Sequence, residues 1–187
     1  MVKAGFIVEG ASERIVVESP KFKELLSACD YELVTPVVDA KGGGNLLPQN
    51  IEVFINRLRD AGAESIFILT DLEDEAHVDT VRERVNHKDI TFSFIAVKAL
   101  EAWYLADSAA MNAWLGIDNF HEEAPEATSD KPWERIKQIA ASLGKRGPGG
   151  KVVFSKKITF DCGFTVQNAS IHPACASAKE LVDYLRQ

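Results

Sequence analysis

Apolar and polar positions alternate along the first hundred residues in segments typical of buried strands and amphipathic helices. Four short apolar runs end at polar or glycine residues, and runs of this length are typical of strands buried on both faces. The predicted strands cover residues 4–8, 33–38, 66–70 and 92–97. Between them apolar residues recur every three or four positions, which predicts helices. Strands that alternate with helices in this way predict a parallel sheet with right-handed crossovers.

The predicted strand order and the domain organisation follow from two further features. Pro36 lies in the second predicted strand, and because proline cannot donate a backbone hydrogen bond, this strand is expected at a sheet edge. The last predicted strand ends at residue 97, and in the second half of the chain helical spacing and loop residues alternate. We therefore expect an α/β core over residues 1–115 and a mainly helical extension over residues 116–187, packed on the same domain. The sequence of residues 152–170 does not predict a particular secondary structure.

Composition and charge narrow the class of protein. The chain has 187 residues and a net charge of −7, which argues against a polybasic protein that coats nucleic acid nonspecifically. No apolar run approaches the roughly 20 residues of a membrane span, so no membrane partner is expected. The first residues do not resemble a signal peptide. Three cysteines without a Cys-x-x-Cys spacing predict no disulfide framework and a reducing, cytoplasmic location.

Acidic residues follow three of the predicted strands. Glu9 follows the first, Asp71 and Glu73 follow the third, and Glu101 lies just past the fourth. Ligands bind outside the carboxyl ends of the strands in open α/β sheets, so these acids are expected to share one crevice. Carboxylates that crowd together repel one another, and oxygen ligands without His or Cys favour Mg²⁺ or Mn²⁺. The alternative for each acid is a helix cap or a first-turn residue that complements the helix dipole.

Short motifs in this order resemble the TOPRIM domain family. That family carries Glu-Gly after the first strand and Asp-x-Asp after the third, and the matching residues here are Glu9-Gly10 and Asp71-Leu72-Glu73. Residues 7–13 are similar to the opening of the TOPRIM domains of overcoming-lysogenisation-defect nucleases. Residues 97–107 resemble a segment of small uncharacterised bacterial TOPRIM-like proteins, which also tend to carry a stretch like residues 175–178 before a last helix.

The resemblance implies a Rossmann-like fold with a mainly parallel four-stranded sheet of order 2-1-3-4, flanking helices and a divalent-metal site. It implies that Glu9 acts as general acid or base and that Asp71 and Glu73 bind Mg²⁺ or Mn²⁺. It further implies that Glu101 and Glu13 either bind the same metal directly or lie around its direct ligands. Glu73 departs from the family pattern, because many members have Asp at this position, and this affects the expected geometry of the site.

Two segments are candidates for binding phosphate. Residues 135–160 contain seven basic residues and no acid, which suits a phosphodiester substrate but also an ordinary solvated surface. Residues 41–45 form a glycine-rich turn before a predicted helix, where backbone amides either cradle a phosphate or simply form a mobile turn. The phosphate-binding candidates are Lys41, Gly43, Gly44, Lys145, Arg146 and Lys156.

Together these features predict a metal-dependent hydrolase of phosphodiester bonds, most simply a nuclease in phage defence or in DNA or RNA processing. Lys98, or a residue of the basic segment, is expected to offset the negative charge that develops on the phosphate. The alternative is a noncatalytic module that binds phosphate or nucleic acid and works with a partner protein. A third interpretation is phosphoryl transfer or phosphatase activity on a small molecule.

Overall fold

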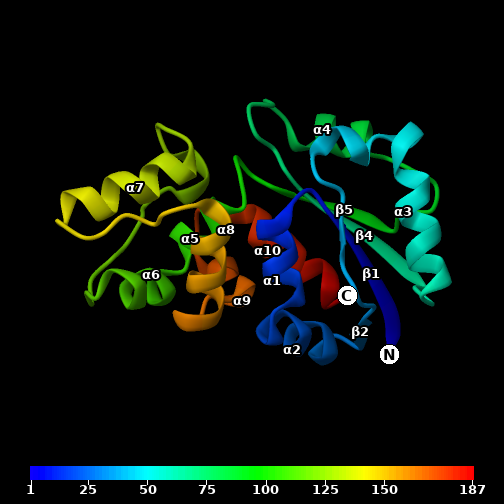
Figure 1. Ribbon diagram of the computed structural model, residues 1–187, viewed down its shortest axis with the longest axis horizontal. Coiled ribbons are helices and arrows are strands. Elements are labelled where there is room, and N and C mark those ends of the chain that lie inside the picture. The colour runs from blue at the N-terminus through cyan, green and yellow to red at the C-terminus, as the bar shows by residue number, and fades with distance from the viewer. The chain divides into compact units, whose positions relative to one another are not determined.

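A computed structural model describes residues 1–187, and the chain forms two compact units (Figure 1). The first contains residues 1–95 and Arg186, and the second contains residues 96–185 and Gln187. The sequence predicted a division near residue 115, but the observed one lies about twenty residues earlier. The reason is helix α5 (Glu101–Ala106), whose six residues are all buried and pack against helices of the second unit.

The first unit contains a mainly parallel sheet, as the alternation of strands and helices predicted. Its strands are β1 (Val2–Val8), β2 (Tyr31–Leu33), β3 (Val38–Asp39), β4 (Ser65–Asp71) and β5 (Phe92–Ala96). The strand order is β2-β1-β4-β5, and β3 also pairs with β1. Strands β2, β3 and β4 all run parallel to β1, so the fold is α/β and consistent with a Rossmann-like architecture.

The observed strand order differs from the predicted four-stranded order 2-1-3-4, because the sheet has five strands. The single strand expected over residues 33–38 is divided into β2 and β3, which pair with different parts of β1. Pro36 lies between them and has no amide hydrogen to donate. The Val37 amide donates instead to Glu18 Oε1 at 3.1 Å, on helix α1 (Ala11–Glu18), so the chain leaves the sheet between the two short strands.

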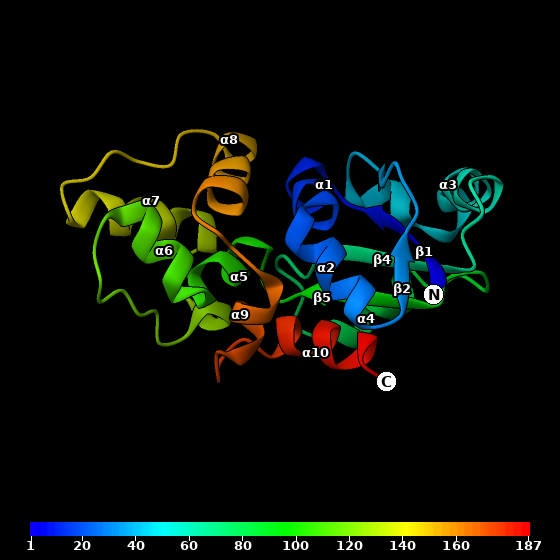
Figure 2. The same cartoon turned by 90° about the horizontal axis from the view of Figure 1, so that it is seen from below.

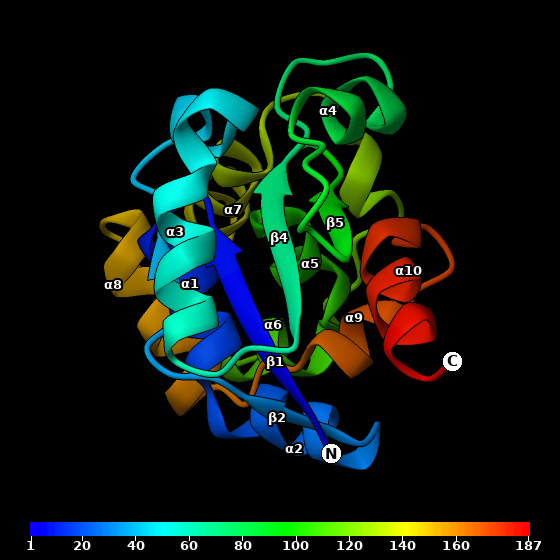
Figure 3. The ribbon, with the colours of Figure 1, turned by 90° about the vertical axis from the view of Figure 1, so that its right-hand side faces the viewer.

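One face of the sheet is covered by helix α3 (Pro48–Asp60), whose apolar face is buried against the strands (Figure 3). Ile7 of β1 pairs with Ile68 of β4, and both side chains belong to the same buried aliphatic cluster. The strands approach this helix closely at Gly5, where a Cβ atom would lie 3.0 Å from Leu58 Cδ1. The other members of the cluster are Val34, Val38, Ala40, Leu46, Ile51, Ile55, Leu58, Ala63, Ile66 and Val85.

The other face of the sheet is aromatic and is covered by helix α2 (Pro20–Ala28). Phe22 of this helix makes an edge contact with Phe6 of β1, with ring centroids 5.6 Å apart. The aromatic row continues to Phe67 and Phe94 on the neighbouring strands. Because successive residues of a strand point to opposite faces, the strands must be apolar at every position to be buried on both sides.

The second unit is helical (Figure 2). Its central helix α5 contacts α6 (Ser108–Leu115), α7 (Pro132–Ser142) and α9 (Val166–Ile171). Tyr104 of α5 makes edge contacts with the rings of Phe154 and Phe164. The segment 152–170, whose secondary structure the sequence did not predict, is largely helical and includes a π-helical turn over Lys157–Asp161. No helix in the structure is long and apolar enough to cross a bilayer. The remaining helices of this unit are α8 (Lys151–Lys156) and α10 (Ala176–Leu185).

Candidate functional site

Glu9 is fixed at the carboxyl end of β1 by its own backbone. Its amide donates to the carbonyl of Leu69 in β4 at 3.1 Å, and its carbonyl accepts from the Gly42 amide at 2.8 Å. These two bonds join the end of β1 to β4 on one side and to the loop after β3 on the other. The carboxyl ends of the three parallel strands therefore meet around Glu9, as expected for a ligand site in such a sheet.

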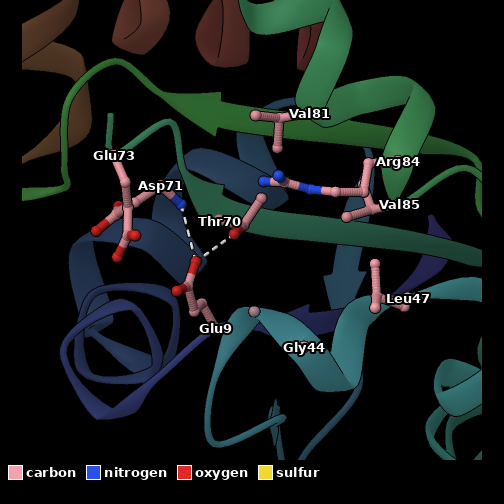
Figure 4. Close-up of a pocket in the computed structure, with 10 residues that line it drawn as sticks. Glu9, Gly44, Leu47, Thr70, Asp71, Glu73, Val81, Arg84 and Val85 are labelled. Carbon is pink, nitrogen blue, oxygen red and sulfur yellow. Dashed lines mark hydrogen bonds between the residues drawn. The ribbon is translucent and has the colours of Figure 1, made fainter. Parts of the chain in front are cut away.

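The Glu9 carboxylate is held by the residues that end β4 (Figure 4). Its Oε2 atom accepts hydrogen bonds from the Thr70 hydroxyl and, at 3.1 Å, from the Asp71 amide. Its Oε1 atom faces Gly43, where a Cβ atom would lie 3.4 Å away. One carboxylate oxygen is thus anchored to the sheet, and the glycine loop approaches the other closely.

A pocket of about 450 Å³ opens at this end of the sheet. In the view of Figure 4 the side chains of Glu9, Asp71 and Glu73 lie to the left, and Leu47 and Val85 lie to the right. The pocket therefore has an acidic end and an aliphatic wall. Its other lining residues are Gly43, Gly44, Thr70, Val81 and Arg84.

The loops after three strands share an unusual backbone conformation. Lys41, Glu73 and Lys98 each lie two residues after the end of a strand, and their φ angles are 57°, 53° and 61°. These φ angles lie in the left-handed region, where the conformational free energy of a residue with a Cβ atom is about 1–2 kcal/mol higher. Such strain is concentrated at functional sites when the surrounding structure holds it in place. Of the three, Glu73 is the one that lines the pocket.

Five of the predicted site residues line this pocket: Glu9, Gly43, Gly44, Asp71 and Glu73. Two others from the same unit do not line it. Glu13 is buried in the first turn of α1, with its carboxylate 3.2 Å from the Cβ position of Gly10. Lys41 is exposed, and its backbone amide donates to Asp39 Oδ1 at 2.8 Å. The pocket therefore does not support the predicted role of Glu13 as a metal ligand or that of Lys41 in binding phosphate.

The remaining predicted residues belong to the second unit. The Lys98 ammonium donates to the carbonyl of Thr128, and the buried Glu101 carboxylate lies 3.1 Å from the Lys151 ammonium. Each of these two predicted site residues thus has a partner within its own unit. The phosphate-binding candidates Lys145, Arg146 and Lys156 are exposed on this unit. The roles predicted for all five residues stay predictions.

A divalent cation is compatible with the chemistry of the acidic end, but no closed metal shell is formed there. No group of three or more His, Cys, Asp or Glu side chains in the structure is arranged to hold a metal ion. Mg²⁺ usually takes only one or two protein carboxylates and completes its octahedron with water and substrate oxygens. The oxygen-only side chains of Asp71 and Glu73 match that requirement, whereas zinc would favour His and Cys ligands.

Nucleophilic cysteine chemistry is not indicated. None of the three cysteines lines the pocket, and none forms a disulfide. Burial raises the pKa of the Cys29 and Cys162 thiols, and at Cys175 the nearby Glu126 carboxylate adds to the same upward shift of the pKa. A raised pKa lowers the fraction of thiolate, which is the nucleophilic form.

Two polar residues of the pocket, Thr70 and Arg84, were not predicted from the sequence. Thr70 is the residue before Asp71 at the same strand end, so its position could have identified it as a site residue. Arg84 is the last residue of helix α4 (Val78–Arg84). It reaches the pocket because this helix packs back on the sheet, where Arg82 donates to the Ser93 carbonyl of β5. Nothing in the local sequence around Arg84 distinguishes it from an ordinary charged residue at a helix end.

Comparisons of the chain with protein families, with curated proteins and with solved structures found no match. Function is therefore inferred from the geometry of the pocket and from the chemistry of its residues.

Proposed function

We propose that the chain hydrolyses phosphodiester bonds in the pocket at the end of β1 and β4, with Mg²⁺ or Mn²⁺ as cofactor. The observation that carries this proposal is the meeting of Glu9, Asp71 and Glu73, from the ends of two adjacent parallel strands, in one pocket. Clustered oxygen ligands in an open α/β crevice suit a hard cation and a phosphate. The resemblance to TOPRIM domains, on the same three residues, supports the proposal.

The three acids have different roles in this proposal. Asp71 and Glu73 would hold the cation, which when bound supplies positive charge against the charge that develops on the phosphate. Glu9 accepts the proton of the attacking water at Oε1, the oxygen that faces Gly43. As the bond from phosphorus to the leaving ester oxygen breaks, Glu9 returns this proton to that oxygen. The hydrogen bonds from Thr70 and from the Asp71 amide to Oε2 keep this carboxylate in one orientation.

The second unit supports nucleic acid as the substrate class. Of the seven basic residues in the acid-free segment 135–160, three are in ion pairs, with Glu122, Glu134 and Glu101. The other four are exposed and form no ion pair, so they can bind phosphates without giving up a partner. These four residues are Lys145, Arg146, Lys156 and Lys157.

The proposal is tested by cleavage of labelled single-stranded and double-stranded DNA and RNA in Mg²⁺, in Mn²⁺ and in EDTA. Wild type is compared with Glu9→Gln and Asp71→Asn, prepared identically. Glu24→Gln is a matched control, because Glu24 is an exposed acid of α2 that pairs with Lys21. We expect metal-dependent cleavage by wild type and the control, and its loss in the other two variants. Cleavage that persists in both pocket variants would contradict the proposal.

A noncatalytic module that binds nucleic acid is the second candidate, and the four unpaired basic residues favour it. The same assay separates the two functions when binding is measured on the same samples. Binding of a labelled strand without cleavage in either metal would support the noncatalytic module and reject the hydrolase.

A further inference from the structure

Arg84 is the one basic side chain among the residues that line the pocket. It lies at the end of α4, and its guanidinium projects into the pocket over Thr70 (Figure 4). The other charged lining residues are the carboxylates of Glu9, Asp71 and Glu73. A phosphate that enters the pocket therefore meets positive charge from the protein itself only at Arg84.

Glu75 holds the Arg84 guanidinium in place and leaves most of its donors free. Arg84 Nη1 lies 2.9 Å from Glu75 Oε1, and the structure contains no other hydrogen bond to this side chain. A guanidinium has five N–H donors in a planar fork, so the remaining edge can bind two oxygens of one phosphate. Arg82 on the same helix differs, because it donates to the Ser93 carbonyl and to Asp79 and lies outside the pocket.

An aliphatic wall faces the pocket beside Arg84. It is formed by Leu47, Val81 and Val85, and the two valines are at most 2% exposed, so their positions are fixed by the core. The wall has no polar side chain to bind a phosphate oxygen. Pockets of about 300–1,000 Å³ enclose organic ligands, and the observed volume of about 450 Å³ lies in this range. The space is thus suited to an organic group attached to the phosphate.

We infer that the pocket binds one nucleoside monophosphate unit, with its phosphate on Arg84 and its nucleoside against Leu47, Val81 and Val85. This inference rests on the proposed function, because it names the substrate class of the same pocket. The unit has two sources with the same chemistry, a free nucleotide and the phosphorylated end of a nucleic-acid strand.

The inference is tested by calorimetric titration of the full chain with adenosine 5′-monophosphate, inorganic phosphate and adenosine, in EDTA and in Ca²⁺. We expect the nucleotide to bind more tightly than either of its parts. Arg84→Gln should weaken nucleotide binding about tenfold or more, because the charge-assisted bidentate hydrogen bonds to the phosphate are removed. Leu47→Ala should weaken nucleotide binding and leave phosphate binding unchanged.

Arg82→Gln is the matched control, since it removes the same charge from the same helix outside the pocket. Equal losses of affinity in Arg84→Gln and Arg82→Gln, or no nucleotide binding by wild type in either buffer, would overturn the inference. A 5′-phosphorylated oligonucleotide that displaces the nucleotide identifies a strand end as the source, and failure to displace it identifies the free nucleotide. Because binding is measured without turnover, nucleotide binding through Arg84 without any cleavage would reject the proposed function and keep this inference.

Discussion

The hydroxyl of Thr70 is the smallest group on which the proposed chemistry depends. It donates to the same Glu9 oxygen that accepts from the Asp71 amide. A hydrogen bond to a charged group contributes about 1.5–3 kcal/mol, more than one between neutral groups. Thr70 does not touch the substrate in the proposed mechanism. It is a positioning residue that acts through Glu9.

Thr70→Ala should therefore lower kcat/KM for phosphodiester cleavage by about ten- to a hundredfold, which corresponds to that hydrogen-bond energy. The decrease should fall mainly on kcat, because Glu9 handles a proton and does not bind substrate. Thr70→Ser keeps the hydroxyl and should retain most of the activity. Steady-state kinetics of the three proteins check this expectation. A Thr70→Ser variant as slow as Thr70→Ala would contradict the role of the hydroxyl.

Cys175 should be unreactive in the folded chain. Its side chain is fully buried, and burial together with the nearby Glu126 carboxylate raises its pKa. We expect iodoacetamide at neutral pH to modify the partly exposed Cys29 and Cys162 first and Cys175 only after denaturation. Mass spectrometry of peptides from native and urea-treated protein measures this order. Rapid modification of native Cys175 would show that this thiol is accessible.

At the scale of elements, Asp107 joins two helices of the second unit. Its Oδ1 accepts from the Ala110 amide at 3.1 Å and so caps α6, and its Oδ2 accepts from the Thr165 amide at 3.1 Å, just before α9. The side chain is almost completely buried. A buried carboxylate that satisfies two backbone amides in this way fixes both helix ends.

Asp107→Ala should lower the free energy of unfolding by about 1–3 kcal/mol, because a helix cap is removed and a second amide is left without its acceptor. All three tryptophans, Trp103, Trp114 and Trp133, lie in the second unit, so urea unfolding followed by tryptophan fluorescence reports on this unit.

Burial raises the pKa of Asp107 above its ordinary value of 3.8. The folded chain thus binds this proton more tightly than the unfolded chain, and the contribution of Asp107 to stability falls as pH rises from 3.8 through the raised pKa.

Asp107→Asn tests the pH dependence separately, because it removes the titrating group and keeps one acceptor oxygen. The fall in stability over this pH range should be smaller in Asp107→Asn than in wild type. The same pH dependence in both proteins would assign it to other groups.

The elements that could be predicted best from the sequence are those in which local pattern and burial agree. The apolar runs around Phe6, Phe67 and Phe94 form strands, because such runs bury both faces of a central strand. The run over residues 33–38 is also apolar but lies at the sheet edge, where Pro36 and the Glu18 side chain interrupt the pairing. The π-helical turn at Lys157–Asp161 has no hydrophobic period of its own, so no sequence pattern predicted it.

For the whole molecule, the net charge of −7 conceals an uneven distribution. The acid-free segment 135–160 lies in the second unit and exposes four unpaired cations. If these residues bind phosphates, affinity for a labelled single strand should fall steeply as salt rises. Replacing Lys145, Arg146 and Lys156 by Gln should reduce the slope of log K against log salt by about 0.7 for each phosphate that is no longer neutralised. An unchanged slope, measured by fluorescence anisotropy, would contradict this role.

The candidate site could be predicted in part, because the rule that parallel strands end at one edge acts on the whole sheet. That rule brought Glu9, Asp71 and Glu73 to one pocket from positions more than sixty residues apart. It could not identify Arg84, which depends on how α4 packs. It also could not show that Glu101 is paired with Lys151, because that ion pair depends on the helical packing of the second unit.

The proposed function depends above all on Asp71 and Glu73 as ligands of a divalent cation, with Glu9 as the group that takes the proton. A titration of the chain with Mn²⁺, followed by electron paramagnetic resonance, measures this division of roles. We expect saturable binding by wild type at millimolar or lower Mn²⁺, an affinity about tenfold or more weaker in Asp71→Asn and Glu73→Gln, and near wild-type affinity in Glu9→Gln. No saturable binding by wild type, or an equal decrease in all three variants, would contradict these roles.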